Sequence, residues 1–151
     1  MPEMRVQIRR GRRTDFTAVM QLLAASGAAV PPPDRTTLRR FRNLVNDLGT
    51  DFYLAVVDGA LVGLVHVTYA RQLSLPPAAR VEQLLVAEPF RRRGVGSALL
   101  AFAEQRAHRR GCGLLSCVLL PAESPARCFV EKAGLQPAGE RFALRLHTTE
   151  D

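Results

Sequence analysis

The stretch Arg91–Leu100, RRRGVGSALL, limits the fold more than any other part of this chain. It follows an apolar run, Val81–Val86, and leads into a segment with alanine and leucine at helical spacing, so we expect a strand, a tight basic turn and a helix. Gly94 and Gly96 allow backbone N–H groups to approach a ligand closely. The start of a helix carries partial positive charge, and we expect the three arginines of the turn to add mobile positive charge around it. The pattern therefore predicts a binding site for a phosphate or pyrophosphate group.

Two common phosphate-binding motifs do not fit this turn. A P-loop ends in Gly-Lys-Ser or Gly-Lys-Thr, but the lysine of this chain is Lys132. A dinucleotide-binding turn needs a third glycine near position 99, where the chain has Leu99, and an acidic residue at the end of the next strand. The next apolar run, Leu114–Leu120, contains no carboxylate. The site is therefore of another type.

The motif Arg91-x-x-Gly94-x-Gly96 resembles the acyl-CoA pyrophosphate loop of the GNAT superfamily of N-acetyltransferases. The run Val81–Val86 is similar to the strand that precedes that loop. Residues 126–135, with the pattern Ala-x-x-Phe-x-Glu-Lys-x-Gly-Leu, resemble the late helix of the family. The resemblance extends over residues 4–146, and it implies an α/β GNAT fold. That fold has a mixed, mostly antiparallel central sheet with splayed fourth and fifth strands, flanked by helices.

The resemblance also implies acetyl-CoA as co-substrate. Backbone groups of the strand before the loop would bind the pantetheine arm, and one N–H there would stabilise the thioester oxyanion. The transfer would be a direct attack in a ternary complex, because no cysteine–histidine pair indicates a covalent intermediate. The residues that we expect to bind the cofactor are Leu84, Leu85, Val86, Arg91, Arg92, Arg93, Gly94, Val95, Gly96 and Ser97.

Glu82 is the candidate general base. It is a carboxylate inside an apolar strand, at a position where several small-amine acetyltransferases carry a glutamate proposed as the base. Strand alternation would place it on the same face as Leu84 and Val86, and partial burial would raise its pKa. The alternative interpretation is an ion pair near the strand end, with Arg80 or Arg71.

The chain departs from the family pattern at three positions. Val130 occupies the usual place of a tyrosine that protonates the leaving thiolate, and Glu123 replaces a familiar asparagine. Val118 stands where ribosomal N-terminal acetyltransferases carry a glutamate. A thiolate with a pKa of about 8.5 can leave without a protein acid. Tyr69 is a weak substitute for the missing acid.

These departures leave the function open among three classes. A small primary amine is the favoured acceptor. A protein or peptide amine is the first alternative, and Val118 and Val130 disfavour it. A non-catalytic acyl-CoA-binding regulatory domain is the second, and Val130 and Glu123 favour it, whereas Glu82 favours an enzyme. A lone strand histidine such as His66 is more often a hydrogen-bonded core residue than a base.

Composition agrees with one domain over residues 1–151. The net charge of +7 is spread over several arginine clusters without interleaved aromatic residues, so we expect no nucleic-acid partner. The three cysteines, Cys112, Cys117 and Cys128, lack metal-ligand spacing, and we expect small buried hydrophobes and no metal. No run approaches the roughly 18 apolar residues of a membrane span, and no export signal is recognised. We therefore expect a cytoplasmic protein without a membrane partner.

Hydrophobic periodicity predicts an alternating order of short strands and helices. Asp34 is a typical N-cap for the helix that we expect to begin at residue 35. Asp58-Gly59 is typical of a hairpin turn. Leu114–Leu120 is almost wholly apolar, so we expect it to be buried on both faces. The resemblance to the GNAT family implies a homodimer, and the apolar segment Phe142–Leu146, whose strand edge would otherwise stay open, adds support. The predicted strands are 6–9, 52–57, 61–69, 81–86, 114–120 and 141–147, and the predicted helices are 16–25, 35–48, 97–109 and 125–134.

Overall fold

The computed structural model describes residues 4–119 and 124–148. Cα distances divide the chain into two compact units, Met1–Val118 and Leu119–Asp151. The strands are β1 (Gln7–Arg10), β2 (Asp51–Val57), β3 (Ala60–Ala70), β4 (Ala78–Val86) and β5 (Leu114–Cys117). The helices are α1 (Phe16–Ala25), α2 (Arg35–Asn46), α3 (Val95–Arg109) and α4 (Ser124–Lys132), with short 3-10 turns η1 (Arg13–Asp15) and η2 (Glu88–Phe90). All elements except α4 belong to the first unit.

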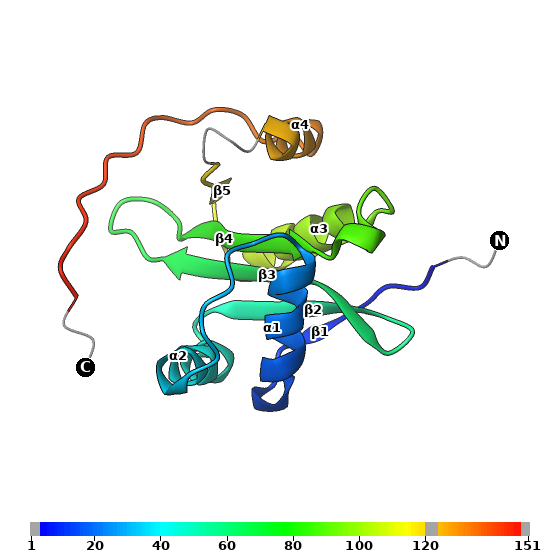
Figure 1. Cartoon of the computed structure of the whole chain (residues 1–151). Helices are drawn as coiled ribbons and strands as arrows, with labels where there is room; N and C mark the ends of the chain where they lie inside the picture. The colour runs from blue at the N-terminus through cyan, green and yellow to red at the C-terminus, as the bar shows by residue number, and fades with distance from the viewer. Residues whose placement is uncertain (1–3, 120–123, 149–151) are drawn as a thin grey trace. The chain divides into compact units, whose positions relative to one another are not determined.

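The five strands form one sheet in the order β1-β2-β3-β4-β5 (Figure 1). The first four strands pair antiparallel, whereas β5 runs parallel to β4. Asp58 and Gly59 join β2 to β3 with φ angles of +50° and +78°, the positive values that a tight hairpin turn requires. The mixed, mostly antiparallel sheet and the hairpin are both found as predicted.

One face of the sheet packs against α1 and α2. In Figure 1, α1 crosses the strands on the near face. The ring centroids of Phe41 and Phe16 are 5.5 Å apart, and those of Phe41 and Phe52 are 6.0 Å apart, so aromatic side chains connect both helices to β2. Asp34 begins α2 as expected, because its carboxylate accepts a hydrogen bond from the Thr37 N–H at 2.9 Å. The buried cluster on this face contains Val19, Leu22, Phe41, Val45, Phe52, Leu54, Leu64 and Ala87.

The other face of the sheet packs against α3. Close packing requires glycine at position 63 of β3, because a Cβ atom there would lie 2.9 Å from Leu99 and 3.2 Å from Val95. The missing side chain lets α3 approach the sheet closely. The buried residues of α3 are Val95, Leu99, Leu100, Ala103 and Ala107.

Strand β4 has two irregularities that the sequence did not reveal. Its pairing with β3 skips one residue, because His66 pairs with Gln83 and Val67 pairs with Val81. Glu82 is therefore the extra residue of a β-bulge, which re-aims side chains. In the described residues, β4 pairs with β5 from Ala78 to Val81, and its second half extends beyond that ladder. The second half of β4 therefore has no strand partner on that side among the described residues.

Two expectations for the C-terminal third are wrong. The apolar strand after α3 is shorter than predicted, Leu114–Cys117, and it forms the sheet edge among the described residues. An edge strand is not enclosed on both faces, so Leu114 is 56% exposed. Residues 141–147 form no strand, since they pair with no other described strand. Their apolar side chains Phe142, Leu144 and Leu146 are exposed.

The cysteines also differ from expectation. Cys112 and Cys117 are half-buried, and Cys128 is exposed, so none of them is a fully buried hydrophobe. None of the three forms a disulfide in the part of the chain that the structure describes. Burial raises the pKa of the Cys112 thiol, and the charge of Arg110 opposes this in part. We assign no chemistry to them.

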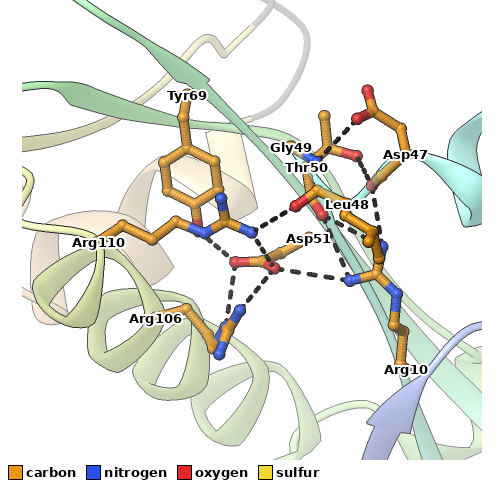
Figure 2. Close-up of polar contacts among 9 residues, drawn as sticks. All are labelled: Arg10, Asp47, Leu48, Gly49, Thr50, Asp51, Tyr69, Arg106 and Arg110. Atoms are coloured by element: carbon orange, nitrogen blue, oxygen red, sulfur yellow. Dashed lines mark hydrogen bonds and ion pairs between the residues drawn. The ribbon is translucent and has the colours of Figure 1, made fainter.

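A buried ionic cluster around Asp51 was not predicted at all (Figure 2). The Asp51 carboxylate, 2% exposed, accepts hydrogen bonds at 3.0 Å from both Arg106 and Arg110, and another from the Tyr69 hydroxyl. Arg10 of β1 lies 3.8 Å away. Burial raises the pKa of Asp51, but these hydrogen bonds outweigh burial and hold it below the ordinary value. The cluster joins β1, β2, β3 and α3.

Candidate functional site

The basic turn between β4 and α3 has the backbone geometry of an anion-binding loop. Gly94 caps the start of α3 with a φ of +87°, a left-handed value that favours glycine. Arg92 also has a positive φ, +61°, which is uncommon for a side-chain-bearing residue and is typical of functional sites. This loop leads directly into the N-terminus of α3, where the helix dipole favours an anion.

The three arginines of the turn have different surroundings. Arg92 is exposed, and the Arg93 guanidinium lies 5.2 Å from the centre of the Phe90 ring. The Arg91 guanidinium donates to the carbonyl oxygen of Val86 at 3.2 Å and to that of Ser26. The expectation that all three arginines supply mobile charge is therefore wrong for Arg91, because backbone carbonyls hold its side chain.

The end of β4 lies immediately before this loop. Leu84, Leu85 and Val86 are half-buried, and they follow the last β4 residue that pairs with β5 in the described part of the chain. Leu84 pairs with Val65 of β3. The unpaired side of this half-strand can offer backbone N–H and C=O groups to an extended ligand. The site therefore combines an open strand edge with an anion-binding turn.

Glu82 lies on the bulge of the same strand, on the α1/α2 face. Its Oε1 accepts a hydrogen bond from the Thr68 hydroxyl at 2.7 Å and one from Arg80 Nε at 2.8 Å. Burial raises the pKa of Glu82, but the hydrogen bonds from Arg80 and Thr68 outweigh burial and lower it. The expected rise in pKa is therefore wrong, and the carboxylate is ionised at neutral pH. The ion pair with Arg80, named as the alternative, is present.

The expected face of Glu82 is also wrong. Gly63 faces α3, and its partner Val86 lies on the same face of the sheet. Two residues further along each strand, the paired residues Val65 and Leu84 lie on that face again. The bulge interrupts the alternation of β4, so Glu82 turns to the opposite face, beside Thr68. The carboxylate and the α3 core thus lie on different sides of the sheet.

His66 lies on the same face as Glu82, beside the bulge. Its ring centroid is 5.9 Å from that of Phe52, and the residue is 9% exposed. Among the described residues, none hydrogen-bonds to its buried Nε2. Burial lowers the pKa of His66, and the charges of Glu82 and Asp47 oppose this in part. His66 is therefore neutral at physiological pH, and it is not the fully hydrogen-bonded core histidine that the sequence favoured.

Tyr69 is held away from this face. Its hydroxyl donates to Asp51, and the Arg110 guanidinium lies 4.3 Å from its ring centre. Burial and the bond to Asp51 raise the pKa of this phenol far above its usual range. A phenol that is so weak an acid, on the α3 face, is poorly suited to protonate a thiolate, and we assign it a structural role.

Two of the three positions that depart from the family pattern lie in the described residues. Val118, next to β5, is 42% exposed. Val130 is a half-buried residue of α4, in the second unit. Glu123 lies outside the described residues. In the part of the chain that the structure describes, no group of three or more His, Cys, Asp or Glu residues could hold a metal ion. Likewise, no described helix is long and apolar enough to cross a membrane.

Comparison with known families identifies the family of this chain. Residues 16–135 match the family described as "Acetyltransferase (GNAT) family". This match covers well over half of the chain and includes β4, the basic turn and α3. The chain belongs to the GNAT acetyltransferase family. No curated protein sequence matches it significantly.

Solved structures agree with the GNAT fold of this acetyltransferase family member. A transcriptional regulator from Bacillus halodurans C-125 has a TM-score of 0.84 and 23% identity, over 94% of this chain and 100% of that one. A ribosomal-protein-alanine N-acetyltransferase from Brucella melitensis biovar Abortus 2308 has a TM-score of 0.77 and 23% identity, over 94% and 100%. An aminoglycoside N-acetyltransferase in complex with CoA has a TM-score of 0.80 and 18% identity, over 97% and 98%. At these identities the likeness establishes the fold.

Proposed function

We propose that this GNAT protein is an N-acetyltransferase that moves the acetyl group of acetyl-CoA to a small primary amine. The observation that carries the proposal is the placement of Glu82. It is an ionised carboxylate on a bulge of the strand that leads to the anion-binding turn. Its lowered pKa makes it a weak base, so the proposal rests on its position next to a strand end open to an extended thioester, where a carboxylate can accept and pass on the proton of the amine.

In this mechanism the backbone of Leu84–Val86 holds the pantetheine arm, and one N–H of this half-strand donates to the thioester oxygen as negative charge develops there. The ammonium of the acceptor, with a pKa of about 10 in water, loses a proton to the Glu82 carboxylate, directly or through a water molecule. The amine nitrogen then attacks the carbonyl carbon, the tetrahedral intermediate loses the second nitrogen proton to solvent, and the C–S bond breaks. The thiolate leaves without a protein acid, because Val130 replaces the usual tyrosine and the Tyr69 hydroxyl donates to Asp51.

Release of free CoA thiol in the presence of a panel of amines tests the proposal. Turnover with small amines supports it. Turnover confined to peptide or protein amines would support the alternative acceptor class, which the ribosomal-protein acetyltransferase exemplifies among structural neighbours. Binding of CoA without turnover on any amine would support the regulatory domain, the third class left open by the sequence.

The cofactor position gives a separate prediction. We expect Gly96→Val to weaken acetyl-CoA binding by at least tenfold, because a branched side chain in the first turn of α3 would occupy the space of the phosphate oxygens. Isothermal titration calorimetry measures this. Ala101→Val is the matched control, since it adds the same branched side chain at an exposed position of the same helix. Equal affinities of a folded Gly96→Val protein and the wild type would contradict the cofactor position.

Three further expectations belong to this proposal. The two units form one acetyltransferase domain, because the family match runs from 16 to 135 and crosses their boundary. The protein acts in the cytoplasm, without a nucleic-acid, membrane or metal partner. It is a homodimer, in which a second copy of the chain buries the exposed apolar segment 142–146.

Light scattering at high micromolar concentration checks the assembly. We expect a mass of twice the 16.6 kDa of one chain. Replacing exposed Leu144 with serine removes apolar surface from the segment and is expected to lower that mass toward the monomer. A wild-type mass of 16.6 kDa would refute the dimer.

A further inference from the structure

Arg91 is exposed like its two neighbours, but its side chain donates hydrogen bonds to two backbone carbonyls. Its Nε donates to the carbonyl of Val86, the last residue of β4, at 3.2 Å. Its terminal nitrogen donates to the carbonyl of Ser26, which ends α1. Its backbone N–H donates to the Glu88 carbonyl at 3.2 Å. One residue of the basic turn thus joins a strand end and a helix end that are 60 residues apart in sequence, from 26 to 86.

The helix end that Arg91 contacts is well defined. Ser26 is 8% exposed, its hydroxyl donates to the Leu23 carbonyl at 2.9 Å, and its own N–H donates to the Leu22 carbonyl at 2.9 Å. Gly27 follows with a φ of +76°, the left-handed residue that often ends a helix. The last carbonyls of a helix lack intrahelical partners and carry partial negative charge, so a guanidinium there is favourable.

We propose that Arg91 is a positioning residue that couples the anion-binding turn to the end of α1, and that it does not itself contact phosphate. This inference rests on the proposed function, because it takes the turn as the CoA site. The guanidinium is planar and donates along a fixed fork, so two carbonyls in different elements fix its orientation. A turn that closes on a pyrophosphate therefore also restrains the α1 end and the connection to α2 that begins there.

The consequence is a difference between Arg91 and Arg93. Arg93 approaches no carbonyl in the described contacts and lies over the Phe90 ring, so its charge can face the pyrophosphate. Removing it should weaken CoA binding in a salt-dependent way. Removing Arg91 should leave that salt dependence in place and loosen residues 22–30 instead.

Two measurements on the full chain test this. The first is hydrogen–deuterium exchange of peptides covering residues 22–30, with and without saturating CoA. We expect CoA to slow exchange there in the wild type and in Arg93→Ala, and not in Arg91→Ala. The second is the CoA affinity at about 50 mM and 300 mM salt. We expect the wild-type salt dependence in Arg91→Ala and a weaker one in Arg93→Ala.

Arg91→Lys is a second, milder variant for the case that Arg91→Ala does not fold. Lysine keeps the positive charge but lacks the planar guanidinium that reaches both carbonyls. We expect this variant to fold, to keep the salt dependence and to lose most of the coupling to residues 22–30. If Arg91→Ala or Arg91→Lys loses the salt dependence as Arg93→Ala does, Arg91 contacts phosphate and the inference is overturned. If the wild type binds CoA without slower exchange in residues 22–30, it is also overturned. A wild type that binds no CoA would instead refute the proposed function together with this inference.

Discussion

Asp51→Asn is expected to remove about 3–5 kcal/mol from the free energy of unfolding. The carboxylate is 2% exposed, and it receives hydrogen bonds from Arg106, Arg110 and Tyr69. Asparagine has nearly the same size but no charge, so it leaves these guanidinium groups without a counter-charge in a partly buried place. Its amide N–H groups also face donors. Since a domain of this size is stable by about 5–15 kcal/mol, the loss is a large share of the total.

Urea denaturation followed by circular dichroism measures this loss, and Asp58→Asn is the control. Asp58 is exposed in the β2–β3 turn with a φ of +50°, a conformation that asparagine tolerates. We expect the control to stay within about 0.5 kcal/mol of the wild type. A loss under 1 kcal/mol in Asp51→Asn would show that the cluster contributes little net stability.

The same carboxylate predicts a pH dependence. Its pKa is lower in the folded chain than the ordinary value of 3.8. Its contribution is therefore fully present above that value, and it is lost as the pH falls through the lower, folded pKa. We expect acid to destabilise the wild type more steeply below about pH 4 than Asp51→Asn, which has no carboxylate to protonate. Equal slopes in this window would contradict the assignment.

The local features of this fold were predictable, and the long-range polar ones were not. Asp34 as a helix cap and Asp58-Gly59 as a turn depend on a few adjacent residues, and both are found as predicted. The Asp51 cluster joins positions 10, 51, 69, 106 and 110, whose proximity is decided by the sheet order and the packing of α3. Because the chain contains many arginines, the sequence does not indicate which few of them pair with the buried Asp51 carboxylate.

The candidate site shows the same division. The glycine spacing and the helix start were readable from residues 91–100, and Gly94 has the left-handed backbone that the turn requires. The bulge at Glu82 was not readable, because a strand with one extra residue has the same composition as a regular one. That bulge changed the face of the carboxylate, and the hydrogen bonds from Arg80 and Thr68 reversed the direction of its pKa shift.

Glu82→Gln is expected to lower kcat by about 10²–10⁴-fold with the true acceptor, the usual contribution of a positioned general base. Glutamine keeps the size of the side chain, and its amide oxygen can still accept from Thr68, but it cannot take a proton. Acetyl-CoA affinity should change little, because the proposed cofactor contacts are the backbone of Leu84–Val86 and the basic turn. Thiol-release kinetics and calorimetry on one preparation separate the two quantities.

Glu104→Gln is the matched control, because Glu104 is exposed on α3, against the opposite face of the sheet. We expect it to keep wild-type turnover. A folded Glu82→Gln enzyme within about threefold of the wild-type kcat between pH 6 and pH 9 would refute the base, since a positioned base contributes at least about 10²-fold. Solvent water would then remove the proton from the acceptor amine.

The pH profile gives a sharper test of Glu82, because its direction follows from the contacts. A base works when ionised, so activity is lost as the pH falls through its pKa, which Arg80 and Thr68 hold below the ordinary value of 4.5. Arg80→Gln removes the ion pair at 2.8 Å and should raise that pKa. The acid limb of kcat/KM should therefore move to higher pH in Arg80→Gln and disappear in Glu82→Gln. An acid limb that stays in place in both variants would belong to another group, and Glu82 would then be a bulge residue held by an ion pair.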